Sequence, residues 1–232
     1  MDEKKTSILT ILVVAIIAVL SLYAVHIGFS CISGFMNGEK SYEITISGFE
    51  NYAINEPLEI YLPLPLINDD AFFSDDMYQN KQFAGWKSSI VQTPSGKMLS
   101  FHSTSFPVQN LHAEFRQTGI LTHTLPKLHG DSSLTYAPQS VDNLSMTYMI
   151  DNYAYWGGPV FTYVYLPESL AETNADSVEI WISTKVKRTN THFVMSSGMT
   201  YYLESHVKIP AQNISGFITI PGFALNVPWD VF

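Results

Sequence analysis

Cysteine is almost absent from this sequence: its 232 residues contain one, Cys31. A single cysteine excludes any disulfide within the chain, although Cys31 could link two copies. Small secreted domains often depend on disulfides for stability. The roughly 190 residues that follow the N-terminal region must therefore be stabilised by a buried core, and a domain of that size can form one.

Charged residues are also scarce, at 14% of the chain, and basic residues are fewer than acidic ones, 12 against 21. Asp2 and Glu3 offset Lys4 and Lys5, so the formal charge of −9 belongs to the rest of the chain. An acidic domain repels phosphate backbones. Nucleic acid is therefore excluded as a partner.

A sustained helical period of apolar residues is missing after the N-terminal region. Alternation with period two takes its place, as in Ser41–Phe49, where Tyr42, Ile44 and Ile46 share one face. Short alternating segments separated by turn residues are typical of antiparallel sheets. The sequence predicts a mainly β outer domain, an antiparallel β-sandwich of the immunoglobulin-like or jelly-roll-like kind.

The N-terminal region has one long apolar run, residues 7–29, with no Asp, Glu, Lys or Arg. At 1.5 Å per residue a helix over these positions reaches about 34 Å, enough to span a hydrocarbon core near 30 Å. Secretory signals have shorter apolar cores. Gly28 and Phe29 before Cys31 fit a lipoprotein signal poorly. The run predicts a retained transmembrane signal-anchor helix.

Orientation and domain limits follow from this prediction. Lys4 and Lys5 precede the apolar run, and basic residues favour the cytoplasmic side. We therefore expect a cytoplasmic N-terminus (1–6), a transmembrane helix (7–29), a stalk (30–41) and an extracytoplasmic domain (42–232), with a possible sub-boundary within 126–143.

Recognised catalytic motifs are missing too, including G-x-S-x-G and glycine-rich phosphate loops. The best candidate for a metal site is the Asp-rich loop, with Asp69, Asp70, Asp75 and Asp76. Several carboxylates in a flexible loop can bind Ca²⁺. The spacing does not follow a calcium-loop pattern, so an acidic solvated loop held by Phe72 and Phe73 is the favoured interpretation.

Two modification signals lie after the apolar run. Asn143 and Asn213 begin N-x-S sequons, which are glycosylation acceptors on an extracytoplasmic domain. Asn143 stands in a loop-like region, whereas Asn213 stands beside an apolar strand. We expect Asn143 to be the more accessible of the two.

Aromatic residues are abundant, at 13%, and concentrate in residues 152–167. Exposed Tyr and Trp side chains can stack on sugars or form a protein-binding hot spot. The alternative is that Tyr153, Tyr155, Tyr163 and Tyr165 alternate and pack a sheet. Packing is the favoured interpretation.

The functional prediction is a membrane-anchored surface protein with a binding, adhesion or envelope-structural role and a protein or glycan ligand. The N-terminus also loosely resembles archaeal type IV pilins, since a short charged leader precedes an apolar helix containing Ser7 and Val14-Ala15-Ile16. That resemblance implies a filament subunit. Pilin leaders are cut after Gly or Ala, whereas Lys5 precedes Thr6 here. A membrane-tethered hydrolase is a third alternative.

Overall fold

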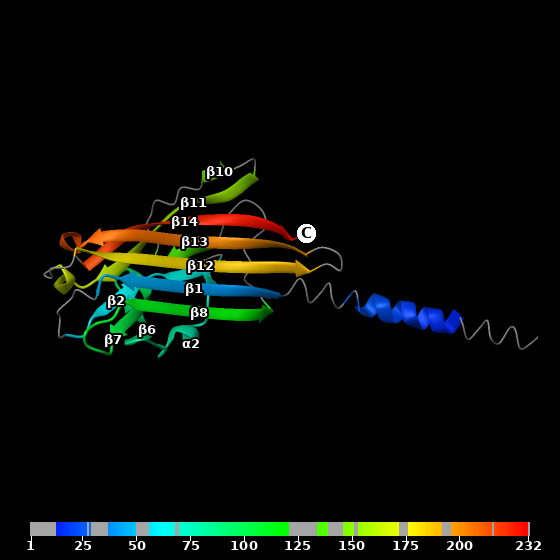
Figure 1. Ribbon diagram of the computed structural model, residues 1–232, viewed down its shortest axis with the longest axis horizontal. Coiled ribbons are helices and arrows are strands. Elements are labelled where there is room, and N and C mark those ends of the chain that lie inside the picture. The colour runs from blue at the N-terminus through cyan, green and yellow to red at the C-terminus, as the bar shows by residue number, and fades with distance from the viewer. Residues whose placement is uncertain are drawn as a thin grey trace, which may run out of the picture.

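The computed structural model describes residues 13–26, 28, 37–49, 56–67, 70–120, 134–138, 146–150, 153–171, 176–191, 196–214 and 216–231. Figure 1 shows a helix near the N-terminus and a body of long strands that run side by side. Within the described ranges this body contains fourteen strands and three short helical segments.

The N-terminal helix covers residues 13–26, and every side chain there is exposed. Its apolar side chains are 47% exposed at Val13 and 71% exposed at Leu22. Among the residues that the structure describes, no helix combines the length and the apolar character needed to cross a membrane.

Most strands belong to one antiparallel sheet, in the order β5-β6-β7-β2-β11-β14-β13-β12-β1-β8, with β10 paired to β11 outside this path. The strands of the large sheet are β1 (Asn37–Ser47), β2 (Glu59–Leu62), β5 (Gln82–Phe83), β6 (Trp86–Thr93), β7 (Gly96–Ser103), β8 (Leu111–Ile120), β10 (Met146–Ile150), β11 (Tyr153–Leu166), β12 (Ser177–Thr191), β13 (Ser196–Pro210) and β14 (Gly216–Val231).

A second, small sheet has the order β4-β3-β9. Its strands are β3 (Leu64–Ile67), β4 (Asp70–Ala71) and β9 (Leu134–Ala137). The short helical segments are α2 (Asp75–Tyr78), η2 (Glu168–Leu170) and η3 (Ala211–Asn213). β9 lies inside the range 126–143, and its Tyr136 is fully buried in the core.

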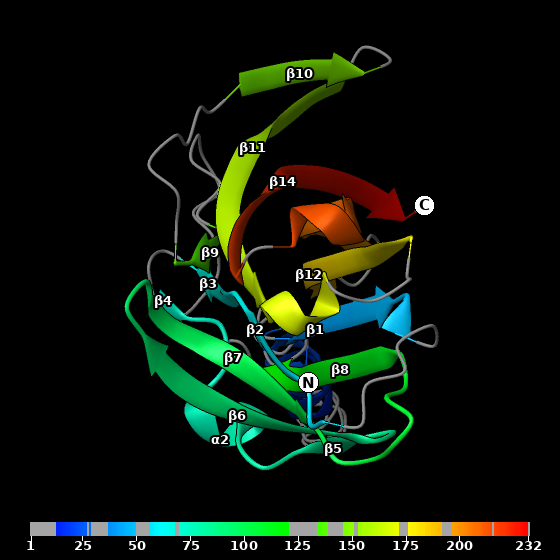
Figure 2. The same ribbon diagram turned by 90° about the vertical axis from the view of Figure 1, so that its left-hand side faces the viewer.

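The large sheet curls until its two end strands, β5 and β8, approach each other. The rings of Phe83 on β5 and Phe115 on β8 have centroids 5.3 Å apart. Figure 2 shows the curl from one end, with β8 between β1 above it and β5 and β6 below it. The sheet is thus nearly closed on itself, and one apolar core fills its inside.

Alternation along the strands supplies that core. On β1, Tyr42, Ile44 and Ile46 are fully buried, while Glu43 and Thr45 point outward and are partly exposed. The same period continues through β12, where Val178, Ile180, Ile182 and Val186 are buried. Because a strand presents successive side chains to opposite faces, this pattern places the alternating apolar sets of β1 and β12 on the inside.

The mainly β, antiparallel prediction is confirmed, but the arrangement differs from the predicted immunoglobulin-like or jelly-roll-like sandwich. A sandwich has two separate facing sheets. Here the two facing layers are parts of one sheet, because continuous ladders join β11 to β14, β14 to β13 and β13 to β12. Inward alternation is the same in both arrangements, so the sequence pattern could not distinguish them.

Two local features bear on the predictions. The segment Thr93-Pro94-Ser95-Gly96 closes a hairpin between β6 and β7, with Thr93 paired to Gly96 as a tight turn requires. β1 begins at Asn37, within the range expected for a stalk, and its Lys40 is only 4% exposed.

Candidate functional site

The Asp-rich loop forms an ordinary solvated edge in its described part. Asp70, Asp75 and Asp76 are exposed, and Asp69 lies outside the described residues. The Asp75 carboxylate accepts from Lys97 Nζ at 2.6 Å. A hydrogen bond from Ser74 lowers the pKa of Asp76. Each described carboxylate thus meets a partner or solvent rather than a shared centre.

Two buried aromatic rings hold this loop, as the favoured interpretation expected. Phe72 and Phe73 are 1% and 2% exposed, and their ring centroids lie 4.7 Å apart in an edge-to-face pair. Within the described ranges, no group of three or more His, Cys, Asp or Glu side chains could hold a metal ion. The geometry therefore offers no support for the calcium prediction.

The predicted modification residues fall in different parts of the chain. Asn213 lies in η3, between β13 and β14, and its side chain is exposed. Asn143 and Cys31 lie outside the described residues. Asn213 is thus accessible, because η3 turns the chain away from the sheet before β14 begins.

The outward face of the large sheet is divided into two halves. The ionic half consists of the outward side chains of β12, β1 and β8, which are mostly charged or hydroxylic. The aromatic half consists of those of β2, β11 and β14. Most of them are aromatic or apolar, and Glu59 and Thr219 are polar: the aromatic or apolar ones are Tyr61, Pro159, Phe161, Tyr163, Tyr165, Phe217, Pro221, Phe223 and Leu225. β13 lies between the two halves.

Tyr163 and Tyr165, expected to pack a sheet, lie on the outward face of β11 and are partly buried there. The Tyr165 ring stacks on Tyr61 at 4.8 Å and contacts Phe217 at 5.1 Å, centroid to centroid. These tyrosines pack against neighbours on the outside of the sheet rather than in its core. The side chains of Tyr153 and Tyr155 lie outside the described part.

An open groove lies over β13, β14 and the adjacent part of β11. Its volume is about 540 Å³, and its lining residues are Pro159, Tyr202, Glu204, His206, Pro221, Gly222, Phe223 and Leu225. Phe223 is 38% exposed. Of the residues whose burial the structure describes outside the N-terminal helix, Phe106, Phe217 and Phe223 are the exposed large apolar ones. Phe223, one of these three, lines the groove.

Pro221 explains why the groove forms at this point. Pro221 O accepts a hydrogen bond from the Ser205 hydroxyl, so the peptide groups of Pro221 face β13. Proline has no N–H to donate to that neighbour. The described β13–β14 ladder ends at the pair Glu204 and Phe223, next to this position. Beyond it, β13 continues beside β12, and β14 continues beside β11.

Gly222 keeps the two strands close where the ladder ends. A Cβ at this position would lie 3.1 Å from Ser205 Oγ and 3.2 Å from Glu204 O. Such contacts are too short for the surroundings to accept without movement. Glycine thus lets the Ser205 hydroxyl reach Pro221.

Two polar side chains in the groove are held by residues of β12. Trp181 Nε1 donates to Glu204 Oε1 at 2.6 Å. His206 Nε2 and Glu179 Oε1 lie 2.6 Å apart. Because both partners come from the neighbouring strand, the Glu204 carboxylate and the His206 ring are positioned before any ligand arrives.

Lys185 of β12 completes the surroundings of the groove. Its Nζ lies 5.4 Å from the centroid of the Tyr202 ring, a distance at which a cation is attracted by an aromatic face. Lys208 on β13 is opposite Glu179 in the strand register. Positive and negative groups are therefore both present beside Tyr202, Glu204 and His206.

The inner face also carries polar groups, and these have packing roles. Lys40 Nζ donates to Phe72 O at 3.1 Å and lies 5.3 Å from the Phe72 ring centroid. Burial lowers the pKa of Lys40. Tyr42 donates to Pro63 O at 2.5 Å, and Tyr136 donates to Leu203 O at 3.2 Å. These contacts join the large sheet to the segments inside it.

The groove was not predicted from the sequence. The sequence of β14 nevertheless contains a signal for a covered outer face, because the strand has apolar residues on both faces. Ile220 and Ala224 face inward, and Phe217, Phe223 and Leu225 face outward. A strand of this kind is expected to be covered on both faces.

Comparison with known proteins adds no assignment: no protein family matches the chain, and no characterised protein or solved structure is similar enough to count as a match.

Proposed function

We propose that this protein is displayed at the outer face of a membrane, attached by its N-terminal segment, and that its β domain binds a ligand through the groove. The observation that carries the proposal is the groove itself. It places exposed aromatic side chains beside polar groups that are already held in position on a broad, nearly closed sheet. Exposed apolar patches of this kind mark interaction sites.

The attachment rests on the N-terminal segment. Residues 7–29 have no charged side chain, and the described helix inside that segment has exposed apolar side chains along its length. A helix over all 23 positions would reach about 34 Å. The β domain does not cover the apolar side chains of this helix, and burial of the helix in lipid would remove them from water.

The binding role rests on the contrast between the groove and the rest of the outer face. Most outward side chains of β12, β1 and β8 are charged or hydroxylic, and some of them pair with one another, as Arg116 does with Glu39. The groove instead combines prolines, Tyr202, Phe223 and Leu225 with a fixed carboxylate and a fixed imidazole. Ligand sites typically join apolar walls to a few positioned polar groups.

Cysteine labelling of cells that express the full chain tests the display. In a Cys31→Ser background, Asn213→Cys adds a thiol on the exposed η3 segment, and Glu3→Cys adds one ahead of the apolar run while keeping Lys4 and Lys5. We expect a membrane-impermeant maleimide to label the Asn213→Cys variant in intact cells. The Glu3→Cys variant should be labelled only after permeabilisation.

The reverse pattern, or protection of both thiols until permeabilisation, would contradict display at the outer face. A denatured sample of each variant supplies the full labelling level against which the intact cells are compared. Matched expression of the two variants removes differences in protein amount.

A further inference from the structure

We infer that the groove binds a neutral saccharide, with a sugar ring on the aromatic wall and its hydroxyl groups at Glu204 and His206. This inference rests on the proposed function and names the ligand class of the same site. Three features carry it: the nature of the apolar side chains, the position of the polar ones, and the balance of charge around them.

The apolar lining consists of rings rather than branched aliphatic chains, apart from Leu225. Tyr202 and Phe223 supply aromatic rings, and Pro159 and Pro221 supply rigid saturated rings. An aromatic face is negative at its centre and attracts the weakly positive C–H groups of a saturated ring. Rigid rings also lose little conformational freedom when a ligand is bound.

The polar lining supplies hydrogen-bond partners for hydroxyl groups. Glu204 Oε1 already accepts from Trp181, and a carboxylate has further acceptor sites on its two oxygens. His206 is held on one side by Glu179 through Nε2, and its second ring nitrogen is a further polar atom. Sugar hydroxyls both donate and accept, so they can bind a carboxylate and an imidazole side by side.

The charges near the groove favour a neutral ligand. The carboxylates of Glu204 and Glu179 stand beside two cations, Lys185 near Tyr202 and Lys208 opposite Glu179. These four charges cancel, so neither an anionic nor a cationic ligand gains from the local field. The chain as a whole carries −9, which disfavours an anionic lipid surface.

A second copy of the chain is a poorer occupant. In a two-fold contact the same patch meets itself, so the charged groups of both copies would be taken out of water together. Removing that many charges from water is costly even where opposite charges pair. A saccharide brings no charge and meets the carboxylates with donors.

Calorimetric titration of the full chain tests the inference. The protein is held in phosphatidylcholine nanodiscs, because glycoside detergents would occupy the site. The probes are maltohexaose, cellohexaose and mannohexaose as neutral saccharides, hexagalacturonate as an anionic one, and hexalysine as a cationic peptide. We expect at least one neutral hexasaccharide to bind, and the Tyr202→Ala substitution to weaken that binding by about tenfold or more.

Matched variants separate a binding effect from a folding effect. Tyr202→Phe keeps the ring and should stay within about threefold of the natural chain. Tyr165→Ala removes an aromatic ring from the same outward face but outside the groove, and should change the affinity less than about twofold. Thermal unfolding of all three variants checks that the domain remains folded.

Three results would overturn the inference. The first is no binding of any neutral saccharide, and the second is saccharide binding that Tyr202→Ala leaves unchanged. The third is Tyr202-dependent binding of hexalysine alone, which would make the groove a peptide site. The third result leaves the proposed ligand-binding role intact, and the cysteine labelling tests the display independently of all three.

Discussion

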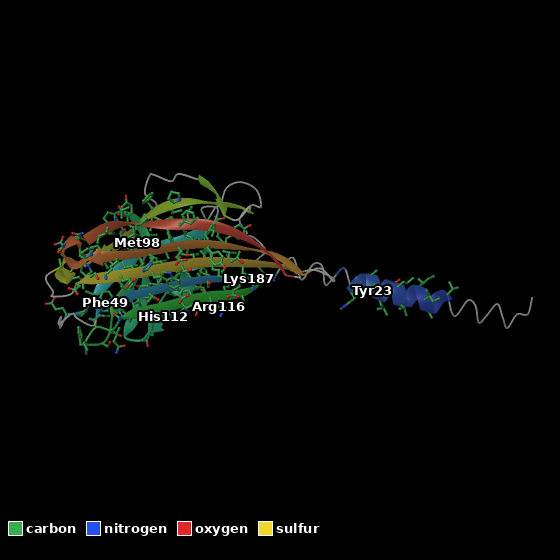
Figure 3. All side chains as sticks on the ribbon, turned by 45° about the horizontal axis from the view of Figure 1, so that its top comes forward. Tyr23, Phe49, Met98, His112, Arg116 and Lys187 are labelled. Atoms are coloured by element: carbon green, nitrogen blue, oxygen red, sulfur yellow. The ribbon has the colours of Figure 1, made fainter. Side chains whose placement is uncertain are left out.

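The ionic and aromatic halves of the outward face differ sharply, although the inward face beneath them is the same. Ile182 on β12 lies beneath the ionic half and Ile220 on β14 beneath the aromatic half, and both are fully buried. Outward, β8 presents His112 and Arg116, which Figure 3 labels on that strand. β14 presents Phe217 and Phe223 instead, each 38% exposed.

This comparison separates what the fold requires from what it leaves free. The curled sheet needs only an apolar inward set on each strand, and both halves supply one. Outward positions are not constrained by the core, and charged or hydroxylic residues cover them at little cost in the ionic half. Among the described residues the aromatic outward set adds nothing to the core, and the ligand proposed above would cover the part of it that lines the groove.

The largest expected effect tests whether the two halves share one core. Ile182→Ala and Ile220→Ala remove the same atoms from beneath the ionic and the aromatic half. Each should lower the free energy of unfolding of the full chain by about 2–5 kcal/mol, because the lost contacts leave a cavity. Denaturant unfolding followed by tryptophan fluorescence measures the change.

Outward neighbours supply the controls for this pair. Ser183→Ala and Thr219→Ala change the adjacent outward positions and should stay within about 0.5 kcal/mol. A large loss of unfolding free energy for one isoleucine substitution and none for the other would mean that the two halves unfold separately. That result would contradict a shared core.

The second effect concerns the tyrosines inside the sheet. Burial raises the pKa of Tyr42, Tyr78 and Tyr136 above the ordinary value of 10.0. As the pH rises, the unfolded chain therefore loses these phenol protons before the folded chain does. The contribution of the protonated phenols to stability is present in full below pH 10 and decreases above it. We expect each buried phenol to contribute a loss of about 1.4 kcal/mol per pH unit there.

Phenylalanine variants test two of these buried phenols separately. Tyr42→Phe acts beneath the ionic half, and Tyr136→Phe acts next to β13, where its hydroxyl donates to Leu203 O. In unfolding curves collected above pH 11, each substitution should reduce the loss of unfolding free energy per pH unit by the contribution of one phenol. Lys40 does not change the slope measured above pH 11. Because burial lowers the pKa of Lys40 in the folded chain, its contribution makes stability rise with pH only up to about 10.5, the pKa of lysine in the unfolded chain. Above that pH the contribution of Lys40 is constant. An unchanged slope in both variants would contradict burial of the phenols.

The smallest effect belongs to the ionic half. Arg116 donates to Glu39 Oε1 from Nε at 2.8 Å, and a second contact comes from Nη2. The carboxylate raises the pKa of the Arg116 guanidinium, which stays charged. Arg116→Met should shift the denaturation midpoint less than any inward variant, because exposed ion pairs contribute little.

Salt sharpens this last prediction. At about 1 M salt the Debye length falls to roughly 3 Å, so the difference between Arg116→Met and the natural chain should vanish. A difference that persists in high salt would indicate that the Arg116 side chain contributes by packing rather than by charge. The ionic and aromatic halves of the outward face would then differ less in how their side chains contribute to stability.

Much of the fold could be predicted because alternation is local. Tyr42, Ile44 and Ile46 indicated β1 directly. The closure of the sheet could not be predicted in this way. It depends on which strands pair across large sequence distances, such as β1 with β12 and β2 with β11.

The candidate groove was harder to predict than the fold. Its lining comes from three strands, and Glu204 and His206 are positioned by Trp181 and Glu179 of a fourth. The sequence suggested other site residues, above all those of the Asp-rich loop, because they lie close together along the chain. In the described part of the structure their side chains do not meet at a common point. Sequence motifs identify short-range sites, whereas this groove is assembled from distant segments.

By itself the sequence determined the class of the domain, its acidity, and the apolar N-terminal segment, because these depend on composition and on spacing along the chain. Only the tertiary structure decided that the strands form one curled sheet and that Pro221 ends a ladder where Tyr202, Glu204 and Phe223 come together. The physical reason is that strand pairing is a long-range choice. The side chains that share a face across strands become neighbours only after the register is set.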